Sequence, residues 1–179
     1  PTPAEVSKKV MVIGGGPAGM EAARIAAERG HDVTLYEKNS VLGGLLIFAN
    51  VVKGPHEMLD DLRKYLIRQQ ELKGVKVVTG TEVTADMIKA EAPDAVILAV
   101  GGTRPAVEFA SVGATNVIGM DDFAGAKIGQ NVTILGSSAQ AVDMAQYLIA
   151  QGKHVTMVTP DPKEKLDKGQ SSWVKQFTI

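Results

Sequence analysis

The sequence has no cysteine, few aromatic residues and no long apolar run. None of its 179 residues is Cys, and Phe, Trp and Tyr together make up 4%. Without Cys the chain itself cannot form disulfides, thiolate nucleophiles, cysteine-ligated zinc sites or cysteine-held iron–sulfur clusters. No segment approaches the ~20 apolar residues that cross a bilayer, and residues 1–10 contain no apolar signal core. We therefore expect a cytoplasmic protein without membrane contact.

An excess of charge of either sign is also missing. The 19 Lys and Arg residues are balanced by 20 Asp and Glu residues, a formal net charge of −1. This balance gives no electrostatic footprint for binding nucleic acid. The three His are isolated from one another in the sequence. No Ser–His–Asp set or carboxylate pair can be placed on convergent elements, so we predict neither a metal site nor a catalytic side chain.

Glycine is abundant, with 19 residues, and 45% of the chain is hydrophobic. Residues 9–13 form a short apolar run that predicts a buried strand. Pro17 and the alanine-rich segment up to residue 29 predict a helix, and residues 33–36 predict a second strand. A strand, a helix and a strand in so short a segment form a βαβ unit with parallel strands.

Further elements extend this unit into an α/β fold with a Rossmann-like, doubly wound parallel sheet. Residues 39–44 are predicted to be a loop. Residues 55–72 predict a helix whose apolar face includes Leu62, Tyr65 and Leu66, and residues 75–78 predict a strand. Thr84 is expected to cap a short helix. Residues 94–100 are so apolar that we expect a strand buried on both faces.

The opening pattern returns after residue 130. A predicted strand at residues 131–135, a helix that ends before Gly152 and a strand at residues 154–158 follow their counterparts at a constant separation of 122 residues. Two nucleotide-type βαβ units are much less expected by chance than one, so this internal repeat is the most informative feature of the sequence. The second unit is predicted to be incomplete.

The first repeat contains the pattern G-x-G-x-x-G between its strand and its helix. Gly14 allows a tight turn, Gly16 lets the backbone approach a pyrophosphate, and Gly19 lets the helix pack closely on the sheet. The first amides of the helix then point at the phosphates. We predict dinucleotide binding here; the alternative is a glycine-rich turn without a ligand. The predicted binding residues are Gly14, Gly15, Gly16, Pro17, Ala18 and Gly19.

An acidic residue ends the second strand of the first repeat. Glu37 follows Gly14 by 23 residues. At a spacing of about 20 residues, an acid in this fold accepts a hydrogen bond from a ribose hydroxyl. Its charge favours a free 2′-hydroxyl and repels a 2′-phosphate. We therefore predict that Glu37 binds the ribose of the dinucleotide.

The second repeat departs from this pattern. It keeps the first glycine as Gly136, and it has Ser138 and Ala141 at the second and third glycine positions. Thr159 stands in the place of Glu37, so no acid is predicted to face a ribose there. Two interpretations stay open: a weaker or more selective nicotinamide-nucleotide site, or a retained fold whose ligand site has decayed. The residues of this weaker site are Gly136, Ser137, Ser138 and Ala139.

Four motifs in order resemble one family. They are residues 14–19, Glu37-Lys38, residues 42–45 (LGGL) and residues 95–102 (AVILAVGG). Together they are similar to the FAD module of the flavoprotein disulfide reductases. Within that fold they resemble the C-terminal part of the old yellow enzyme-related group of 2,4-dienoyl-CoA reductase, 2-enoate reductase and trimethylamine or histamine dehydrogenase. The resemblance covers nearly the whole chain.

The resemblance implies further contacts with the cofactor. In that family the segment matching residues 42–45 runs beside the dinucleotide, and the residue matching Val83 holds adenine through its backbone. The segment matching residues 95–102 normally ends A-T-G, and here Val100 replaces the threonine. The site residues added on this basis are Lys38, Gly43, Gly44, Leu45, Val83, Ala99, Val100 and Gly101.

The resemblance also implies cofactors, partners and domain boundaries. We expect FAD, or ADP in its place, on residues 1–106, an incomplete FAD/ADP-binding domain. A linker is expected at residues 107–129 and the beginning of an NAD(P)-binding-like domain at residues 130–179, with NAD(P)H as a further ligand. FMN and a 4Fe–4S cluster are expected only in an upstream part. The chain is thus interpreted as a fragment whose partner is the FMN-barrel and iron–sulfur segment of the same polypeptide.

The preferred function is the cofactor-binding portion of an NAD(P)H:flavin oxidoreductase that is not active alone, because the chemistry belongs to the cofactor. Two alternatives stay open: a non-catalytic module that holds ADP, and an NAD-only dehydrogenase domain that uses Glu37. Uncovered sheet edges are expected to promote pairing of copies into a homo-oligomer.

Overall fold

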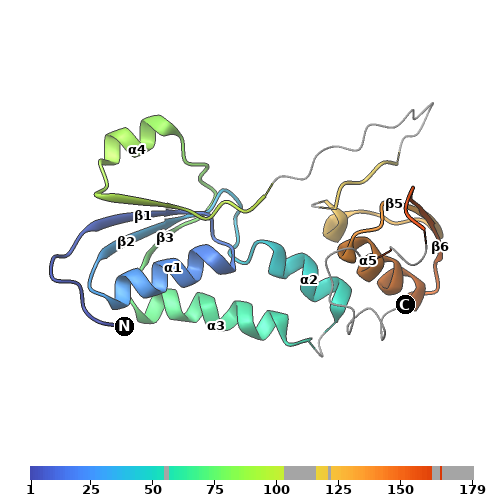
Figure 1. Ribbon diagram of the computed structural model, residues 1–179, viewed down its shortest axis with the longest axis horizontal. Coiled ribbons are helices and arrows are strands. Elements are labelled where there is room, and N and C mark those ends of the chain that lie inside the picture. The colour runs from blue at the N-terminus through green and yellow to red at the C-terminus, as the bar shows by residue number, and fades with distance from the viewer. Residues whose placement is uncertain (55–56, 103–115, 121, 163–165, 167–179) are drawn as a thin grey trace. The chain divides into compact units, whose positions relative to one another are not determined.

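The chain forms two compact units, described separately here. A computed structural model describes residues 1–54, 57–102, 116–120, 122–162 and 166. Unit 1 comprises Pro1–Asn50 and Glu57–Thr115, and unit 2 comprises Val51–His56 and Asn116–Ile179. Each contains parallel strands with helices packed against them (Figure 1). The predicted α/β class with a Rossmann-like parallel sheet is therefore confirmed.

Unit 1 contains a four-stranded sheet in the order β3-β2-β1-β4. Its strands are β1 (Lys9–Ile13), β2 (Asp32–Tyr36), β3 (Lys76–Val78) and β4 (Ala95–Leu98). All neighbouring pairs are parallel, and in the middle of the sheet Val10 pairs with Val33 on one side and Ala95 on the other. Because the strands are parallel, their carboxyl ends meet at one edge, where ligands bind in this class of fold.

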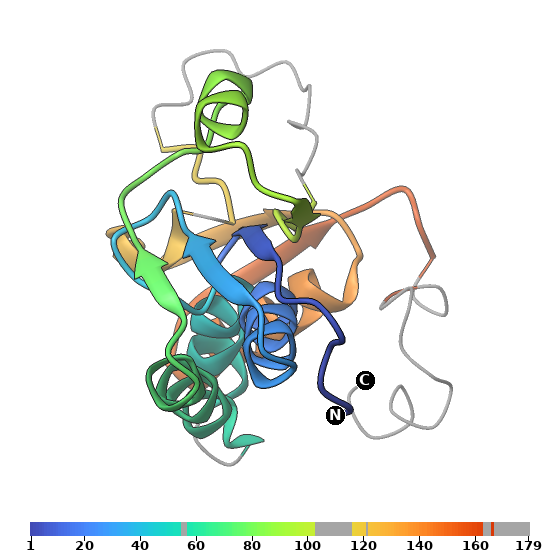
Figure 2. The same ribbon diagram turned by 90° about the vertical axis from the view of Figure 1, so that its left-hand side faces the viewer.

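Helices cover the two faces of this sheet unequally. Helices α1 (Pro17–Glu28) and α3 (Leu59–Leu72) lie on one face, and the short α4 (Ala85–Glu91) lies on the other (Figures 1 and 2). As predicted, Thr84 caps α4, its hydroxyl accepting from the Met87 amide at 3.3 Å. The core lies under α1, where Met20 and Ala23 pack with β1 and β2 and are fully buried.

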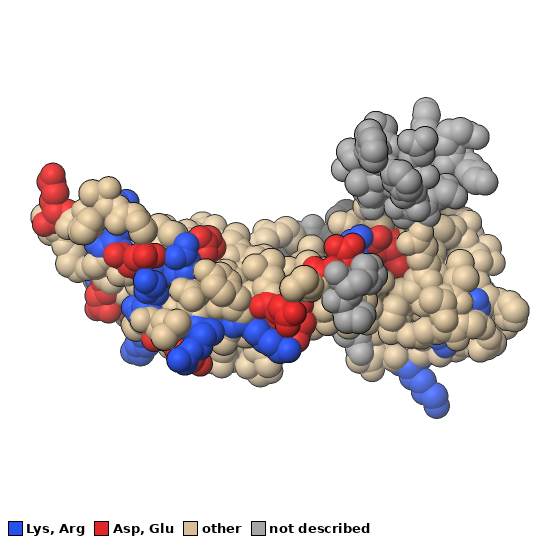
Figure 3. Space-filling view, turned by 90° about the horizontal axis from the view of Figure 1, so that it is seen from below, with Lys and Arg blue, Asp and Glu red and all other residues tan. Residues whose placement is uncertain are grey.

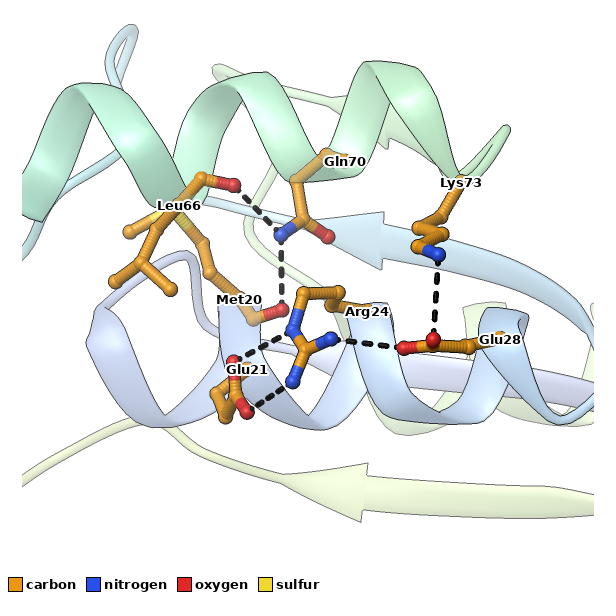
Figure 4. A network of polar contacts seen from close by, with 7 residues as sticks. All are labelled: Met20, Glu21, Arg24, Glu28, Leu66, Gln70 and Lys73. Atoms are coloured by element: carbon orange, nitrogen blue, oxygen red, sulfur yellow. Dashed lines mark hydrogen bonds and ion pairs between the residues drawn. The ribbon is translucent and has the colours of Figure 1, made fainter. Parts of the chain in front are cut away.

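A polar network fastens α3 to α1 (Figure 4). The buried Gln70 amide donates to the carbonyl of Met20 in α1 and to the carbonyl of Leu66 in its own helix, both at 2.9 Å. At the surface, Arg24 bridges Glu21 and Glu28 within α1, and Lys73 of α3 reaches Glu28 at 3.3 Å. These contacts hold α1, and with it the turn that precedes α1, in a fixed place on the sheet.

The outer side of these helices is charged but not of one sign. On the face of unit 1 seen from below, Lys and Arg lie beside Asp and Glu (Figure 3). In α3, Asp60 pairs with Arg63 at 2.9 Å and with Lys64 at 2.8 Å. Exposed pairs of this kind contribute little to stability, because water and salt screen the attraction between the charges.

The structure departs from the predicted elements in three respects. Helix α2 (Leu45–Lys53) has no counterpart among the predicted elements. The helix expected from residue 55 begins at Leu59 instead, residues 55–56 lie outside the described residues, and Leu62 and Tyr65 of its predicted apolar face are exposed. The buried stripe runs through Leu66 and Gln70, because these positions face α1. The third difference concerns β4, which is not buried on both faces. Leu98 is 71% exposed because the helices α1 and α3 cover only the other face.

Unit 2 repeats the opening of unit 1. Strand β5 (Asn131–Leu135), helix α5 (Ala139–Ala150) and strand β6 (His154–Val158) each begin and end 122 residues after β1, α1 and β2. The strands pair in the same parallel register. The strand–helix–strand prediction is thus confirmed. Of the predicted linker, residues 107–115 and 121 lie outside the described residues, and a 3₁₀ helix, η2 (Phe123–Gly125), lies in the remainder.

No helix within the described residues has both the length and the apolarity needed to cross a membrane. Those residues also contain no group of three or more His, Asp or Glu arranged to hold a metal ion.

The contact between β2 and α4 predicts a late-titrating tyrosine. The Tyr36 hydroxyl donates to the Glu91 carboxylate, and this bond together with burial raises the pKa of Tyr36 to about 12. This contact contributes fully to the free energy of unfolding at a pH below ~10, the pKa of tyrosine in the unfolded chain. The contribution is lost as the pH rises through 12. Ultraviolet titration should show one of the three tyrosines ionising late. Tyr36→Phe should remove that late ionisation step, and Glu91→Gln should lower the pH at which it occurs. Ionisation of all three tyrosines near pH ~10 would contradict the contact.

Candidate dinucleotide site

The turn between β1 and α1 lies between the ends of the two neighbouring strands. The Gly14 amide donates to the Tyr36 carbonyl at the end of β2 at 2.8 Å. Gly14 has φ +109°, and a Cβ built on it would lie 2.3 Å from the Ala99 carbonyl oxygen beyond β4. Only glycine meets both conditions. The chain therefore turns sharply at the carboxyl edge of the sheet, as the motif predicts.

Gly19 and Gly16 have opposite surroundings. A Cβ on Gly19 would lie 1.8 Å from the Gly14 carbonyl oxygen, so the first turn of α1 packs directly on the turn. Apart from its two neighbours in the chain, no residue has an atom within 4 Å of a Cβ built on Gly16. The backbone at Gly16 is ordinary and extended, with φ −75° and ψ 179°. The space beside Gly16 is therefore not required by the protein's own packing.

The start of α1 suits an anionic group in that space. Pro17 occupies the first helical position, and the Met20 amide donates to the Gly16 carbonyl at 2.9 Å. The amides of Ala18 and Gly19 come before this bond, at the helix end where N–H groups lack partners inside the helix and the helix dipole is positive. Diphosphate oxygens fit such amides. The residues present thus fit the dinucleotide that the sequence predicts.

Glu37 is buried against the glycine turn, with 6% of its surface exposed. Its Oε2 accepts from the Gly15 amide at 2.7 Å, and its Oε1 accepts from the Asn39 amide at 2.8 Å. A Cβ on Gly15 would lie 2.9 Å from the Glu37 Cβ, so a glycine is needed for this approach. A carboxylate offers about four lone pairs. The two amides use two of them, which leaves acceptors for ribose hydroxyls.

The LGGL segment runs beside the same turn. The Gly43 amide donates to the Gly15 carbonyl at 2.9 Å. A Cβ on Gly44 would lie 3.0 Å from the Gly16 Cα. One neighbour of this segment was missed by sequence reasoning: Arg63 of α3 donates to the Leu42 carbonyl at 3.3 Å. Its position in the helix gives no signal for that contact, because a charged residue in α3 is expected to face solvent.

The other predicted residues lie near this cluster with less direct contact. The Ala99 amide donates to the Ile13 carbonyl at 2.8 Å, which continues β4 past its last pair. Val100 is 68% exposed, and Gly101 has φ +74°. The side chains of Lys38 and Leu45 are exposed, and those of Pro17 and Val83 are half-buried. Contacts of these residues with a cofactor stay predictions.

The corresponding turn of unit 2 is built differently. Gly136 has φ +123° and donates to the Val158 carbonyl at 2.9 Å, as Gly14 does to Tyr36. Ser138 caps α5, which begins at Ala139, by accepting from the Ala141 amide at 3.3 Å. The buried Ser137 hydroxyl donates to Asp161 Oδ2 at 2.5 Å. Asp161 therefore lies against this turn, two residues after Thr159, and the prediction that no acid faces a ribose there stays a prediction.

Comparison with known proteins places this geometry in a family context. Residues 8–177 match the family model described as pyridine nucleotide-disulphide oxidoreductase. The NADH oxidase of Thermoanaerobacter brockii is 38% identical over 161 residues, which are 87% of this chain and 25% of the relative. The cinnamate reductase of Clostridium sporogenes is also 38% identical over 161 residues, 87% of this chain and 23% of the relative.

Solved structures give the same result. A 2-naphthoyl-CoA reductase in complex with 2-naphthoyl-CoA has a TM-score of 0.77 and 39% identity over 87% of this chain and 24% of that chain. Histamine dehydrogenase from Rhizobium sp. 4-9 has a TM-score of 0.65 and 26% identity over 88% of this chain and 25% of its own. The chain thus spans about a quarter of the length of these relatives.

Proposed function

Because the chain belongs to the pyridine nucleotide-disulphide oxidoreductase family, we propose that it is the dinucleotide-binding part of an NAD(P)H-dependent flavin oxidoreductase. The likeness to old yellow enzyme-related reductases that its motifs carry is confirmed by relatives such as the cinnamate reductase and the 2-naphthoyl-CoA reductase. In this proposal unit 1 binds the ADP part of FAD and unit 2 binds a nicotinamide nucleotide.

The observation that carries the proposal is the space at Gly16. Gly16 directly precedes the first amides of α1, and Glu37 lies against the preceding residue of the same turn. The amides of Ala18 and Gly19 would hold the diphosphate and Glu37 the ribose. Bound FAD would supply the chemistry, accepting a hydride from the nicotinamide. The chain's own residues fix the position of the cofactor.

The electrons are proposed to pass to another part of the same polypeptide that holds FMN and a 4Fe–4S cluster. The length of the relatives, about four times the part that this chain matches, supports the existence of a further part. Because this chain has no Cys, the cluster would have to be held in that part.

The test measures the ribose contact of Glu37. In the parent chain ADP should bind about tenfold tighter than 2′-deoxy-ADP or 3′-deoxy-ADP, because a hydrogen bond to a charged acceptor contributes roughly 1.5–3 kcal/mol. Glu37→Gln should weaken ADP binding and remove most of that preference. Isothermal titration calorimetry on the whole chain measures the preference for ADP over each of the two deoxy analogues, in the parent chain and in Glu37→Gln.

The control is Glu82→Gln, which removes the same charge from an exposed loop residue of unit 1. Equal affinity for ADP and both deoxy analogues in the parent chain would defeat the proposed role of Glu37. Flavin absorbance in the purified chain supports the FAD assignment. A colourless preparation that releases ADP on denaturation would favour the alternative of an ADP-holding module.

A further inference from the structure

The repeat between the two units extends to individual hydrogen bonds. The amide of the first glycine donates to the last residue of the second strand in both units, Gly14 to Tyr36 and Gly136 to Val158. The residue before the helix accepts from the fourth helical residue in both, at 2.9 Å for Gly16 and 3.1 Å for Ser138. The two units differ at the residue that follows the second strand, which is Glu37 in unit 1 and Thr159 in unit 2.

In unit 1 the single residue Glu37 makes two contacts. One carboxylate oxygen accepts from the amide two residues later, at Asn39, and closes the turn after β2. The other oxygen accepts from Gly15, the residue after the first glycine, and so places a negative charge against the glycine turn.

In unit 2 two residues share these contacts. The Thr159 hydroxyl accepts from the amide two residues later, at Asp161, at 3.1 Å. The Asp161 carboxylate then accepts from Ser137, the counterpart of Gly15, at 2.5 Å. Thr159 thus keeps the local turn, and that turn brings an acid back to the loop, where it meets the Ser137 hydroxyl in place of the Gly15 amide.

We propose that Asp161 replaces Glu37 as the ribose acceptor of unit 2 and makes this unit select NADH over NADPH. The proposal rests on the proposed function, in which unit 2 binds a nicotinamide nucleotide. Ser137 uses one of the carboxylate's lone pairs, and a ribose 2′-hydroxyl can donate to another. A 2′-phosphate offers no hydroxyl and carries about −1.5 to −2 charges, which a neighbouring carboxylate repels.

Ser137 gives the carboxylate its position. With 8% of its surface exposed, Ser137 is buried, so its hydroxyl is held in place and directs Asp161 toward the turn. Ser137→Ala keeps the negative charge and removes only this direction. The charge of Asp161 and its placement can therefore be tested separately.

The experiment titrates the whole chain with NADH and with NADPH, using the fluorescence of the reduced nicotinamide. The parent chain should bind NADH at least about tenfold tighter than NADPH. Asp161→Asn should weaken NADH binding and bring the two affinities within about threefold of each other. Ser137→Ala should also reduce the preference for NADH over NADPH, but by a smaller factor than Asp161→Asn.

One variant serves as a matched control. Asp122→Asn removes the same charge from unit 2 at an exposed residue that precedes η2, and it should not alter the ratio of the two affinities. There Phe123 packs on Tyr147 in the last part of α5, away from the turn at its beginning. Glu37→Gln changes the corresponding acid of unit 1 and shows whether the nicotinamide nucleotides bind there instead.

Each contrary outcome has its own meaning. A parent chain without preference, or a preference that both Asp161→Asn and Ser137→Ala leave intact, overturns the inference and leaves the proposed function standing. If Glu37→Gln changes the ratio of the two affinities and Asp161→Asn does not, the nicotinamide nucleotide binds to unit 1, and the inference is again overturned. If neither nucleotide binds, the inference and the proposed role of unit 2 both fail. The deoxy-ADP titration still decides the role of unit 1.

Discussion

A Gly16→Val variant is expected to fold like the parent chain and to bind ADP at least a hundredfold more weakly, a loss of roughly 3 kcal/mol or more. The fold should tolerate the side chain, because no residue except the two chain neighbours has an atom within 4 Å of a Cβ at this position, and the backbone has an ordinary extended conformation. The ligand should not tolerate it. The added methyl groups would fill the space beside the first amides of α1, and each lost amide–phosphate hydrogen bond costs about 1.5–3 kcal/mol.

Two measurements separate the effects on folding and binding. Urea unfolding should give Gly16→Val a midpoint close to that of the parent chain, while calorimetry records the loss of ADP binding. Gly125→Val provides the control, since a Cβ on Gly125 in η2 also meets no atom within 4 Å, and it should leave ADP affinity unchanged. Unchanged ADP affinity in Gly16→Val would mean that the phosphates do not lie beside Gly16.

The glycine turn could be predicted from the sequence because its determinants are local. A residue with φ +109° whose Cβ would meet the Ala99 carbonyl has to be glycine, so the requirement at position 14 can be recognised directly in the sequence. Pro17 at the first position of α1 is a local signal of the same kind. The repeat could be predicted for the same reason, since glycines that end helices and β-branched strand residues recur at a constant separation.

Features that depend on distant neighbours could not be predicted in this way. Leu62 and Leu66 are both apolar residues of α3, yet Leu62 is 44% exposed and Leu66 is 5% exposed. Which of them is buried depends on where α1 lies, and the sequence of α3 does not contain that information. Likewise, β4 is apolar on both faces, but the short α4 on the face opposite α1 and α3 leaves Val96 and Leu98 exposed.

Asp161 was missed for a different reason. A position-by-position alignment of the two repeats sets Thr159 opposite Glu37 and therefore predicts that the acid is lost. The structure shows that a threonine turn moves the acid two residues along the chain and back to the loop. A search for an acid within one turn of Thr159 would have found it.

Gly19→Ala is expected to lower the free energy of unfolding by about 3 kcal/mol, the upper part of the range typical of overpacked cores. The added Cβ would lie 1.8 Å from the Gly14 carbonyl oxygen and 3.3 Å from the Ala99 Cβ. Backbone atoms cannot yield as the end of a side chain can, so α1 must move away from β1. Met20 and Ala23, which have no exposed surface, would lose packing in that movement, and ADP binding should weaken with it.

Unit 2 supplies the matched control for this prediction. Ala141 occupies the position of Gly19 in the repeat and is itself buried, with 8% of its surface exposed. Helix α5 therefore already accommodates the methyl group that α1 does not. Ala141→Gly should cost only the roughly 1 kcal/mol of lower helix propensity. Urea unfolding of both variants compares the two costs, and a Gly19→Ala chain no less stable than Ala141→Gly would show that close packing of α1 on the turn does not stabilise unit 1.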